Sequence, residues 1–316
     1  MALLAFLGRH GPKALFLGVF LGIALPDLAS LARPLVGPSV TLLLLLALLR
    51  VEWQAMGAVV RRPLLCGGLI AWMMLASPLA MAAVLHLLPL PLPQPLVIAL
   101  VLMTAAPPIV GAAAVAMLVG LDGPLAIVIA LGSTLLAPLT VPPLALLLLD
   151  LQLEVGLLEL MARLALIVVP AFVGAWLLRR LAGLPRLRGL THQIDGLVVV
   201  VMLVFAVAIM DGVTATLFTR PGTVALWLLA AFVANPTLQL VTTLAFRPLG
   251  LKRALTAGLL AGNCNMGMML AALPSGSDYD IVLFFALAQL PMYMLPALFL
   301  PVYRRLLARA GGTTAA

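Results

Sequence analysis

The chain alternates long apolar runs with short polar or charged connectors over almost its whole length. An apolar run of about 20 residues can cross the roughly 30 Å hydrocarbon core of a membrane as a helix. The sequence lacks the ten-residue segments of alternating polarity that an outer-membrane barrel would need. We therefore predict an all-α membrane protein.

Ten crossings account for the apolar runs. The predicted spans are residues 14–32, 36–56, 65–88, 95–119, 124–149, 156–179, 195–217, 222–246, 253–274 and 279–303. No soluble domain or long linker interrupts them, so residues 1–316 are expected to form one integral membrane domain. Spans 1–5 occupy residues 1–150 and spans 6–10 occupy residues 151–316. Because five is odd, the second half enters the membrane from the opposite side, which predicts a 5+5 inverted repeat.

The composition excludes a soluble protein, because 65% of the residues are hydrophobic and 9% are charged. The basic residues add an orientation, since cytoplasmic loops are enriched in Lys and Arg. Arg33 and Arg220 fall on one side, and Arg163 falls within a span. The fifteen on the other side are Arg9, Lys13, Arg50, Arg61, Arg62, Arg179, Arg180, Arg186, Arg188, Arg247, Lys252, Arg253, Arg304, Arg305 and Arg309. We predict that both termini are cytoplasmic, in an inner or plasma membrane.

This topology also explains the net charge of +8, so the lipid bilayer and not nucleic acid is the expected partner. Residues 1–32 have the features of a signal peptide, but they also supply the first span of the repeat. We expect them to be kept.

Two apolar runs contain residues that disfavour a regular helix. Span four contains Pro107, Pro108 and Gly111, and span nine contains "GNCNMG" at 262–267. Proline lacks an amide donor, and glycine permits unwound backbone. Transporters place discontinuous helices at such corresponding positions of inverted repeats. We predict that spans 4 and 9 are discontinuous and cross; a simple proline kink is the alternative.

Two stretches that include these runs resemble the bile acid:sodium symporter (BASS) family. Residues 106–142, "APPIVGAAAVAMLVGLDGPLAIVIALGSTLLAPLTVP", are similar to its fourth and fifth spans, with "STLLAP" at Ser133 to Pro138. Residues 262–273, "GNCNMGMMLAAL", are similar to its ninth span. The resemblance implies a panel domain and a core domain in which spans four and nine cross. It also implies alternating access that carries organic anions, driven by sodium in the sodium-coupled members.

The chain departs from the family at the positions that bind sodium. The family's hydroxyl, amide and carboxylate ligands are replaced here by Ala112, Ala113, Ala126, Ala130, Leu260 and Cys264, although Asn265 is kept. The resemblance therefore implies the fold without sodium coupling. We expect no bound metal and no cofactor.

The polar and helix-breaking residues within the spans are the candidates for binding a small solute. The predicted substrate-binding residues are Pro107, Pro108, Gly111, Ser133, Thr134, Asn263, Cys264, Asn265, Thr237 and Gln289. Local roles stay open for several of them. The hydroxyls can bond to carbonyls of their own helix, and the amides can satisfy the freed backbone.

Charged residues within a span are costly and are therefore candidates for function. Arg163 and Asp211 both lie near the basic-poor side and could pair with each other. An interfacial ion pair and a substrate contact are the two interpretations. Asp122 is expected to cap span five, with Pro124 in its first turn.

These residues predict a secondary transporter of a small organic solute. The N-termini of half-helices at the two breaks favour an anion. No set of nucleophile, base and orienting group can be assembled, so an enzyme with catalytic residues is not expected. Because no carboxylate lies at the breaks, proton coupling lacks a carrier and facilitated diffusion stays open. The alternative is a non-transporting binding or scaffold protein with the same fold. The sequence predicts neither the substrate nor the oligomeric state.

Overall fold

The computed structural model describes residues 11–312 except 89, 150–155 and 275. Almost all of the described residues are helical, and the β-type pairing among them is one isolated bridge between Pro108 and Cys264. The predicted all-α class is therefore confirmed. The expected boundary between the two repeats, at residues 150 and 151, lies outside the described residues.

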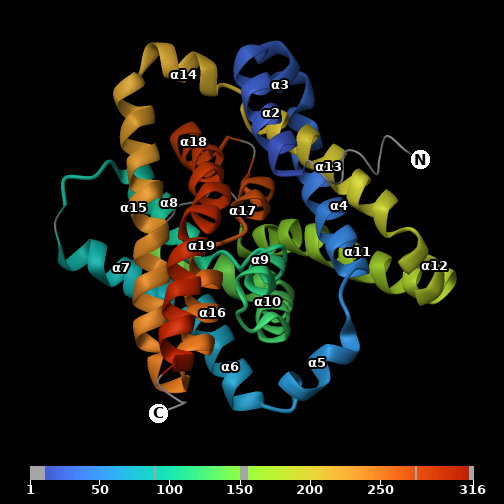
Figure 1. Ribbon diagram of the computed structural model, residues 1–316. Coiled ribbons are helices and arrows are strands. Elements are labelled where there is room, and N and C mark those ends of the chain that lie inside the picture. Colours follow the sequence, from blue (N-terminus) through green and yellow to red (C-terminus); the bar gives the residue numbers. More distant parts are fainter. Residues whose placement is uncertain (1–10, 89, 150–155, 275, 313–316) are drawn as a thin grey trace.

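The helices follow one another with short connections (Figure 1). In chain order the α-helices are α2 (Gly11–Ala24), α3 (Pro26–Ala32), α4 (Val36–Leu49), α5 (Trp53–Val60), α6 (Pro63–Ala71), α7 (Ser77–Leu87), α8 (Gln94–Ala105), α9 (Ala112–Val119), α10 (Gly123–Leu149), α11 (Leu157–Ala182), α12 (Leu184–Gly189), α13 (Thr191–Ala208), α14 (Val213–Thr219), α15 (Pro221–Ala245), α16 (Leu251–Gly262), α17 (Met266–Ala272), α18 (Tyr279–Leu287) and α19 (Gln289–Gly312). Two 3-10 turns, η1 (Arg33–Leu35) and η3 (Arg247–Leu249), and one π-helical segment, η2 (Trp72–Ala76), complete them.

Seven helical stretches among the described residues are long and apolar enough to cross a membrane. They are Pro26–Leu49, Pro63–Leu87, Gly123–Leu148, Leu157–Ala182, Thr191–Thr219, Pro221–Ala245 and Tyr279–Arg309. The other three predicted spans consist of shorter helices. Span one corresponds to α2, span four to α8 and α9, and span nine to α16 and α17.

The predicted boundary between spans one and two is wrong. We expected a connector at 33–35, but the helical path continues from Pro26 to Leu49 through a 3-10 turn. The chain leaves the helical conformation at Leu25 instead, with φ −126° and ψ 75°. A residue before proline is pushed out of the α region, and proline is well suited to open the next helix. The helix is therefore interrupted just before Pro26.

The helices pack as two groups (Figure 1). In the first group, α13 packs against α2, α3 and α4, and α4 packs against α11. In the second group, α15 packs against α16 and α18, and α10 packs against α6, α8, α9 and α16. The groups meet where α10 packs on α11 and where α17 packs on α4 and α11.

Each group contains one pair of glycines spaced by four residues at a close helix contact. On α2, a Cβ added at Gly18 would lie 2.7 Å from the Cβ of Ala206 on α13, and one added at Gly22 would lie 2.7 Å from the Cβ of Met210, just after α13 ends. On α16, a Cβ added at Gly258 would lie 2.5 Å from the backbone carbonyl oxygen of Gln239. A Cβ added at Gly262 would lie 2.4 Å from Gln239 Cγ. Small residues at this spacing let helix backbones approach closely within a membrane.

The predicted pairing of Arg163 with Asp211 is wrong. Arg163 instead pairs with Glu159, one turn earlier on α11, at 2.7 Å. Asp211 accepts from Arg33 at 2.9 Å. The end of α13 therefore pairs with η1 of its own packing group, and Arg163 needs no partner from another helix.

Candidate functional site

Both predicted helix interruptions are present. Between α8 and α9, residues 106–111 leave the helix, and between α16 and α17, residues 263–265 do so. The second break is shorter than predicted, because Met266 already begins α17 and Gly267 lies within it. The break ends early because the Asn265 side chain caps the new helix, accepting from the Met268 amide at 3.1 Å.

The two breaks are hydrogen-bonded directly to each other. The Ile109 amide donates to the Asn263 carbonyl at 2.8 Å, and the Asn265 amide donates to the Pro107 carbonyl at 2.7 Å. These bonds flank the bridge between Pro108 and Cys264. Unwound backbone in an apolar interior must find partners, and here each break supplies them for the other. The predicted contact between the breaks is confirmed.

A buried chain of side chains supports the end of α16. The Asn235 amide donates to the Gly262 carbonyl at 2.5 Å, and the Gln239 amide donates to the Asn235 carbonyl oxygen at 2.7 Å. The Tyr303 hydroxyl donates to the Gln239 carbonyl oxygen at 2.5 Å. Thus α15 carries a link from α19 to the carbonyl left free where α16 stops.

Sequence reasoning did not find this network. The available signal was the spacing of two amide side chains, Asn235 and Gln239, four residues apart on one face of α15. Tyr303 could not be recognised as their partner because it lies 64 residues after Gln239.

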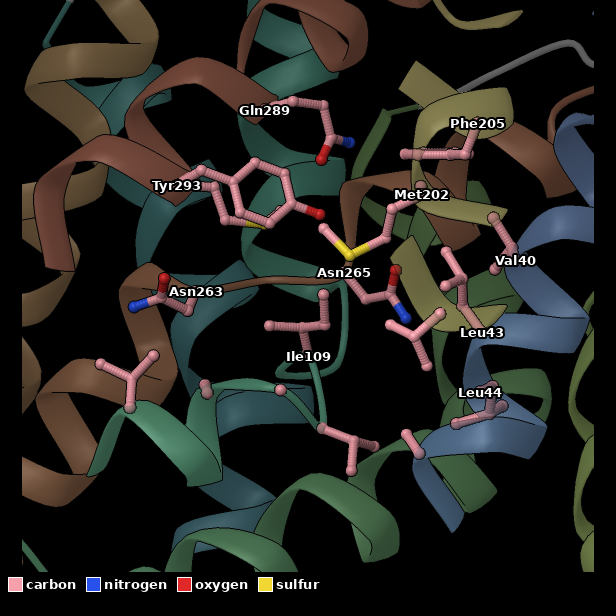
Figure 2. A pocket seen from close by; sticks show the side chains of 18 of the residues that line it. Val40, Leu43, Leu44, Ile109, Met202, Phe205, Asn263, Asn265, Gln289 and Tyr293 are labelled. Atoms are coloured by element: carbon pink, nitrogen blue, oxygen red, sulfur yellow. The ribbon is translucent and has the colours of Figure 1, made fainter. Parts of the chain in front are cut away.

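A cavity of about 480 Å³ lies beside the crossing of the two breaks (Figure 2). Both helix groups form its wall, with α4 and α13 on one side and the breaks and α19 on the other. The labelled residues of Figure 2 that line it are Val40, Leu43, Leu44, Ile109, Met202, Phe205, Asn263, Asn265, Gln289 and Tyr293. Arg50 and Asp195 line its far end, where they form an ion pair at 2.8 Å. The cavity is therefore mainly apolar, with a few polar groups at defined places.

Gln289 is the polar residue of the cavity whose amide nitrogen has no partner. Gln289 is 2% exposed, and no described atom accepts a hydrogen bond from its Nε2. It follows the interruption at Ala288, between α18 and α19. Leaving a buried donor unsatisfied costs about 1–3 kcal/mol. The Tyr293 hydroxyl, one turn further along α19, points into the same cavity (Figure 2).

The cavity brings together four of the ten predicted binding residues: Gly111, Asn263, Asn265 and Gln289. The two asparagines also serve the local backbone. The Asn263 amide donates to the Leu259 carbonyl at 2.7 Å, and Asn265 caps α17.

The other six predicted binding residues do not line the cavity. Pro107, Pro108 and Cys264 lie in the crossing itself, where the Cys264 thiol donates to the Ala261 carbonyl at 2.9 Å. Ser133 and Thr134 are buried in α10, and Thr134 donates to the Ala130 carbonyl of its own helix at 2.7 Å. Thr237 is exposed on α15 and donates to the Val233 carbonyl at 2.7 Å. Thr134 and Thr237 therefore make the local bonds that the sequence had left open.

The apolar wall of the cavity was missed by sequence reasoning. Val40, Met202 and Phe205 belong to runs that are apolar on every face, so no pattern distinguishes the residues that face a cavity from those that face lipid. The tyrosine at 293 gave no signal either, although an amphipathic ring beside Gln289 at helical spacing could have been noted.

The positions where the resembled family places sodium ligands hold buried residues, and one of them, Ala112, lines the cavity. Ala112, Ala113, Ala126, Ala130, Leu260 and Cys264 are all buried. Within the described residues, no group of three His, Cys, Asp or Glu side chains could hold a metal ion.

No protein-family model matches the chain, and no curated protein matches it.

Proposed function

We propose that the chain is a secondary transporter of the BASS type, which moves a small organic anion across a membrane by alternating access without sodium coupling. The crossing of two interrupted helices beside a cavity walled by both helix groups carries this proposal. In the proposed topology the chain crosses ten times as two inverted repeats of five. The two breaks then occupy corresponding positions, where transporters place their substrate sites.

Alternating access is supported by the different packing at the two ends of the cavity. One end reaches Arg50 and Asp195. Away from that end, the Phe205 ring of α13 lies against α17, because a Cβ added at Gly267 would lie 2.7 Å from it. The Tyr279 hydroxyl also donates to the Asp211 carbonyl at 3.0 Å, which joins α18 to the end of α13. With the basic end cytoplasmic, this is an inward-facing arrangement.

The polar groups of the cavity favour a solute that accepts hydrogen bonds. The Gln289 amide and the Tyr293 hydroxyl can both donate, and Arg50 adds a cation at the mouth. The remaining wall is aliphatic or aromatic, so the body of the solute should be partly apolar. A volume of about 480 Å³ is in the range of small-molecule sites.

Proton coupling would need a carboxylate in the cavity that can carry the proton. Asp195 is the cavity's carboxylate, and it is already paired with Arg50 at 2.8 Å. Facilitated diffusion therefore fits the residues at least as well as proton coupling.

The test is uptake of a panel of radiolabelled carboxylates and sulfonates into proteoliposomes. For a transported anion, Gln289→Leu should lower apparent affinity about tenfold, because a hydrogen bond to a charged group is worth about 1.5–3 kcal/mol. Thr237→Val is the matched control, since that hydroxyl bonds only to its own helix. The apolar crossing also fits a non-transporting scaffold, which would take up no solute from the panel. Equal effects of the two substitutions on apparent affinity would show that Gln289 does not bind the solute.

A further inference from the structure

A second pocket, of about 280 Å³, lies next to the mouth of the cavity. It is formed where α4 ends and α5 begins, against the end of α11 and the short helix α12. Three arginines line it, Arg50, Arg179 and Arg188, together with one carboxylate, Glu52. Unlike the wall of the cavity, the wall of this pocket has an excess of positive charge.

Arg179 is held in this pocket by the end of α4. Its Nη1 donates to the carbonyls of Leu48, Leu49 and Val51 at 3.2, 3.1 and 2.9 Å. Its guanidinium carbon lies 5.9 Å from the centre of the Trp53 ring. Leu48 and Leu49 end α4 and Val51 follows it, so one nitrogen of Arg179 contacts three carbonyls at the end of this helix, where carbonyls lack helical partners. Among the described residues, none accepts from its other nitrogens and no carboxylate pairs with it.

The other two arginines differ in their partners. Arg50 is paired with Asp195 at 2.8 Å. Arg188 is exposed on α12, and no carboxylate of the described part of the chain forms an ion pair with it. Arg179 and Arg188 are therefore two cations without counterions that face one pocket, and Glu52 balances only part of their charge.

The surroundings of the pocket favour a lipid over a soluble anion. The end of α11 beside it exposes Trp176, Leu177, Leu178 and Leu181, and Trp53 at its rim is also exposed. Tryptophan favours the boundary between lipid and water. Basic pockets between membrane helices bind anionic head groups, each Lys or Arg near the surface contributing about 1 kcal/mol.

We infer that this pocket binds the phosphate group of an anionic phospholipid, with Arg179 and Arg188 as its ligands and the acyl chains along the exposed face of α11. This site is separate from the proposed transport cavity and does not depend on transport. The two share Arg50, which lines both. A bound phosphate would compete with Asp195 for Arg50 and so alter the mouth of the cavity.

The test is native mass spectrometry of the full-length protein in detergent with equal amounts of phosphatidylglycerol and phosphatidylcholine. The wild type should retain phosphatidylglycerol preferentially, and Arg188→Gln should weaken that retention about fivefold. Arg186→Gln is the matched control, because Arg186 lies on the same short helix and outside the pocket wall. Arg188→Lys should keep most of the retention. Arg188 is preferred to Arg179 because Arg179 also caps α4.

Three outcomes would overturn the inference. One is an absence of preference for phosphatidylglycerol in the wild type. Another is equal loss in Arg188→Gln and Arg186→Gln, which would mean general attraction between basic residues and lipid. The third comes from adding millimolar inorganic phosphate. If it displaces the bound lipid from the wild type, the pocket recognises free phosphate and the assignment to a lipid fails.

Discussion

At the scale of single residues, the space around Gly262 shows why the helix break needs a glycine there. The residue ends α16, and its carbonyl accepts from Asn235. A Cβ at this position would lie 2.4 Å from Gln239 Cγ, 2.7 Å from Gln239 Nε2 and 2.9 Å from Asn235 Oδ1. The side chains that support the break therefore occupy the space that any other residue would need.

We predict that Gly262→Ala lowers the free energy of unfolding by about 1–3 kcal/mol, the usual cost of overpacking a core. Thermal unfolding in detergent, followed by circular dichroism, would measure the change. Gly67→Ala is the control, because that helical position on α6 has no atom within 4 Å of the added Cβ. Its midpoint should stay the same or rise slightly, since alanine favours helices. A Gly262→Ala midpoint equal to that of Gly67→Ala would show that α15 can move to accommodate the added methyl group without a loss of stability.

At the scale of elements, α15 acts as a support for the interrupted span formed by α16 and α17. Asn235 and Gln239 lie on the face of α15 that meets α16, and they carry the hydrogen-bond chain from Tyr303 to Gly262. Thr237, between them in sequence, is exposed. One face of α15 therefore supports α16, and another face of the same turn is exposed.

This arrangement predicts different effects for two neighbouring substitutions on α15. Asn235→Leu should lower the free energy of unfolding by about 1–3 kcal/mol, because the Gly262 carbonyl and the Gln239 amide each lose a buried partner. Thr237→Val should change it by about 0.5 kcal/mol or less, as is usual for exposed positions. Unfolding midpoints of the two variants in the same detergent would compare them. Similar losses would mean that α15 contributes packing alone.

At the scale of the whole molecule, the charges distinguish the two ends of the helix bundle. In Figure 1, α3 and α14 lie at one end, and α5 and the C-terminal end of α19 lie at the other. The first end carries the ion pairs Arg33–Asp211 and Arg220–Asp280. The second end carries Arg61 and Arg62, directly after α5, and Arg304, Arg305 and Arg309 on α19, and we propose that it is cytoplasmic.

Cysteine labelling in intact cells tests this orientation. Both native cysteines are free and buried, so the background should be low. A membrane-impermeant maleimide should label Gly222→Cys, at the start of α15, and should label Arg186→Cys, on α12, only after the cells are opened. Labelling of Arg186→Cys from outside would reverse the topology.

The buried groups at the positions where the resembled family binds sodium predict that the proposed transport is independent of sodium. A sodium ion at the crossing would have to find its oxygens among main-chain carbonyls, several of which already accept hydrogen bonds. Burying a charge with few partners costs roughly several kcal/mol. Uptake of a transported solute, or the unfolding midpoint, should be the same in sodium and in choline at equal ionic strength. A saturable increase in sodium that Asn265→Ala abolishes would show that backbone and amide groups still form a site.

The sequence alone determined the features that depend on local chemistry. The length of the apolar runs predicted helices, and the prolines and glycines located both breaks to within a few residues. Asp122 was expected to cap span five, and its side chain accepts from the Leu125 amide at 3.1 Å. Each of these depends on residues within a few positions of one another, because helix formation, helix ends and proline effects are local.

Only the tertiary structure decided which residues meet. The hydrogen bond from Arg33 to Asp211 joins residues 178 positions apart, and the sequence had suggested Arg163 as the partner instead. The sequence also could not distinguish Gln289, which lines the cavity, from Thr237, which does not. In a chain where most helices are apolar on every face, hydrophobic periodicity no longer indicates which face is inside. The facing of each helix is then set by close packing and by buried hydrogen bonds to distant partners, such as Gly262 against Asn235 and Gln239.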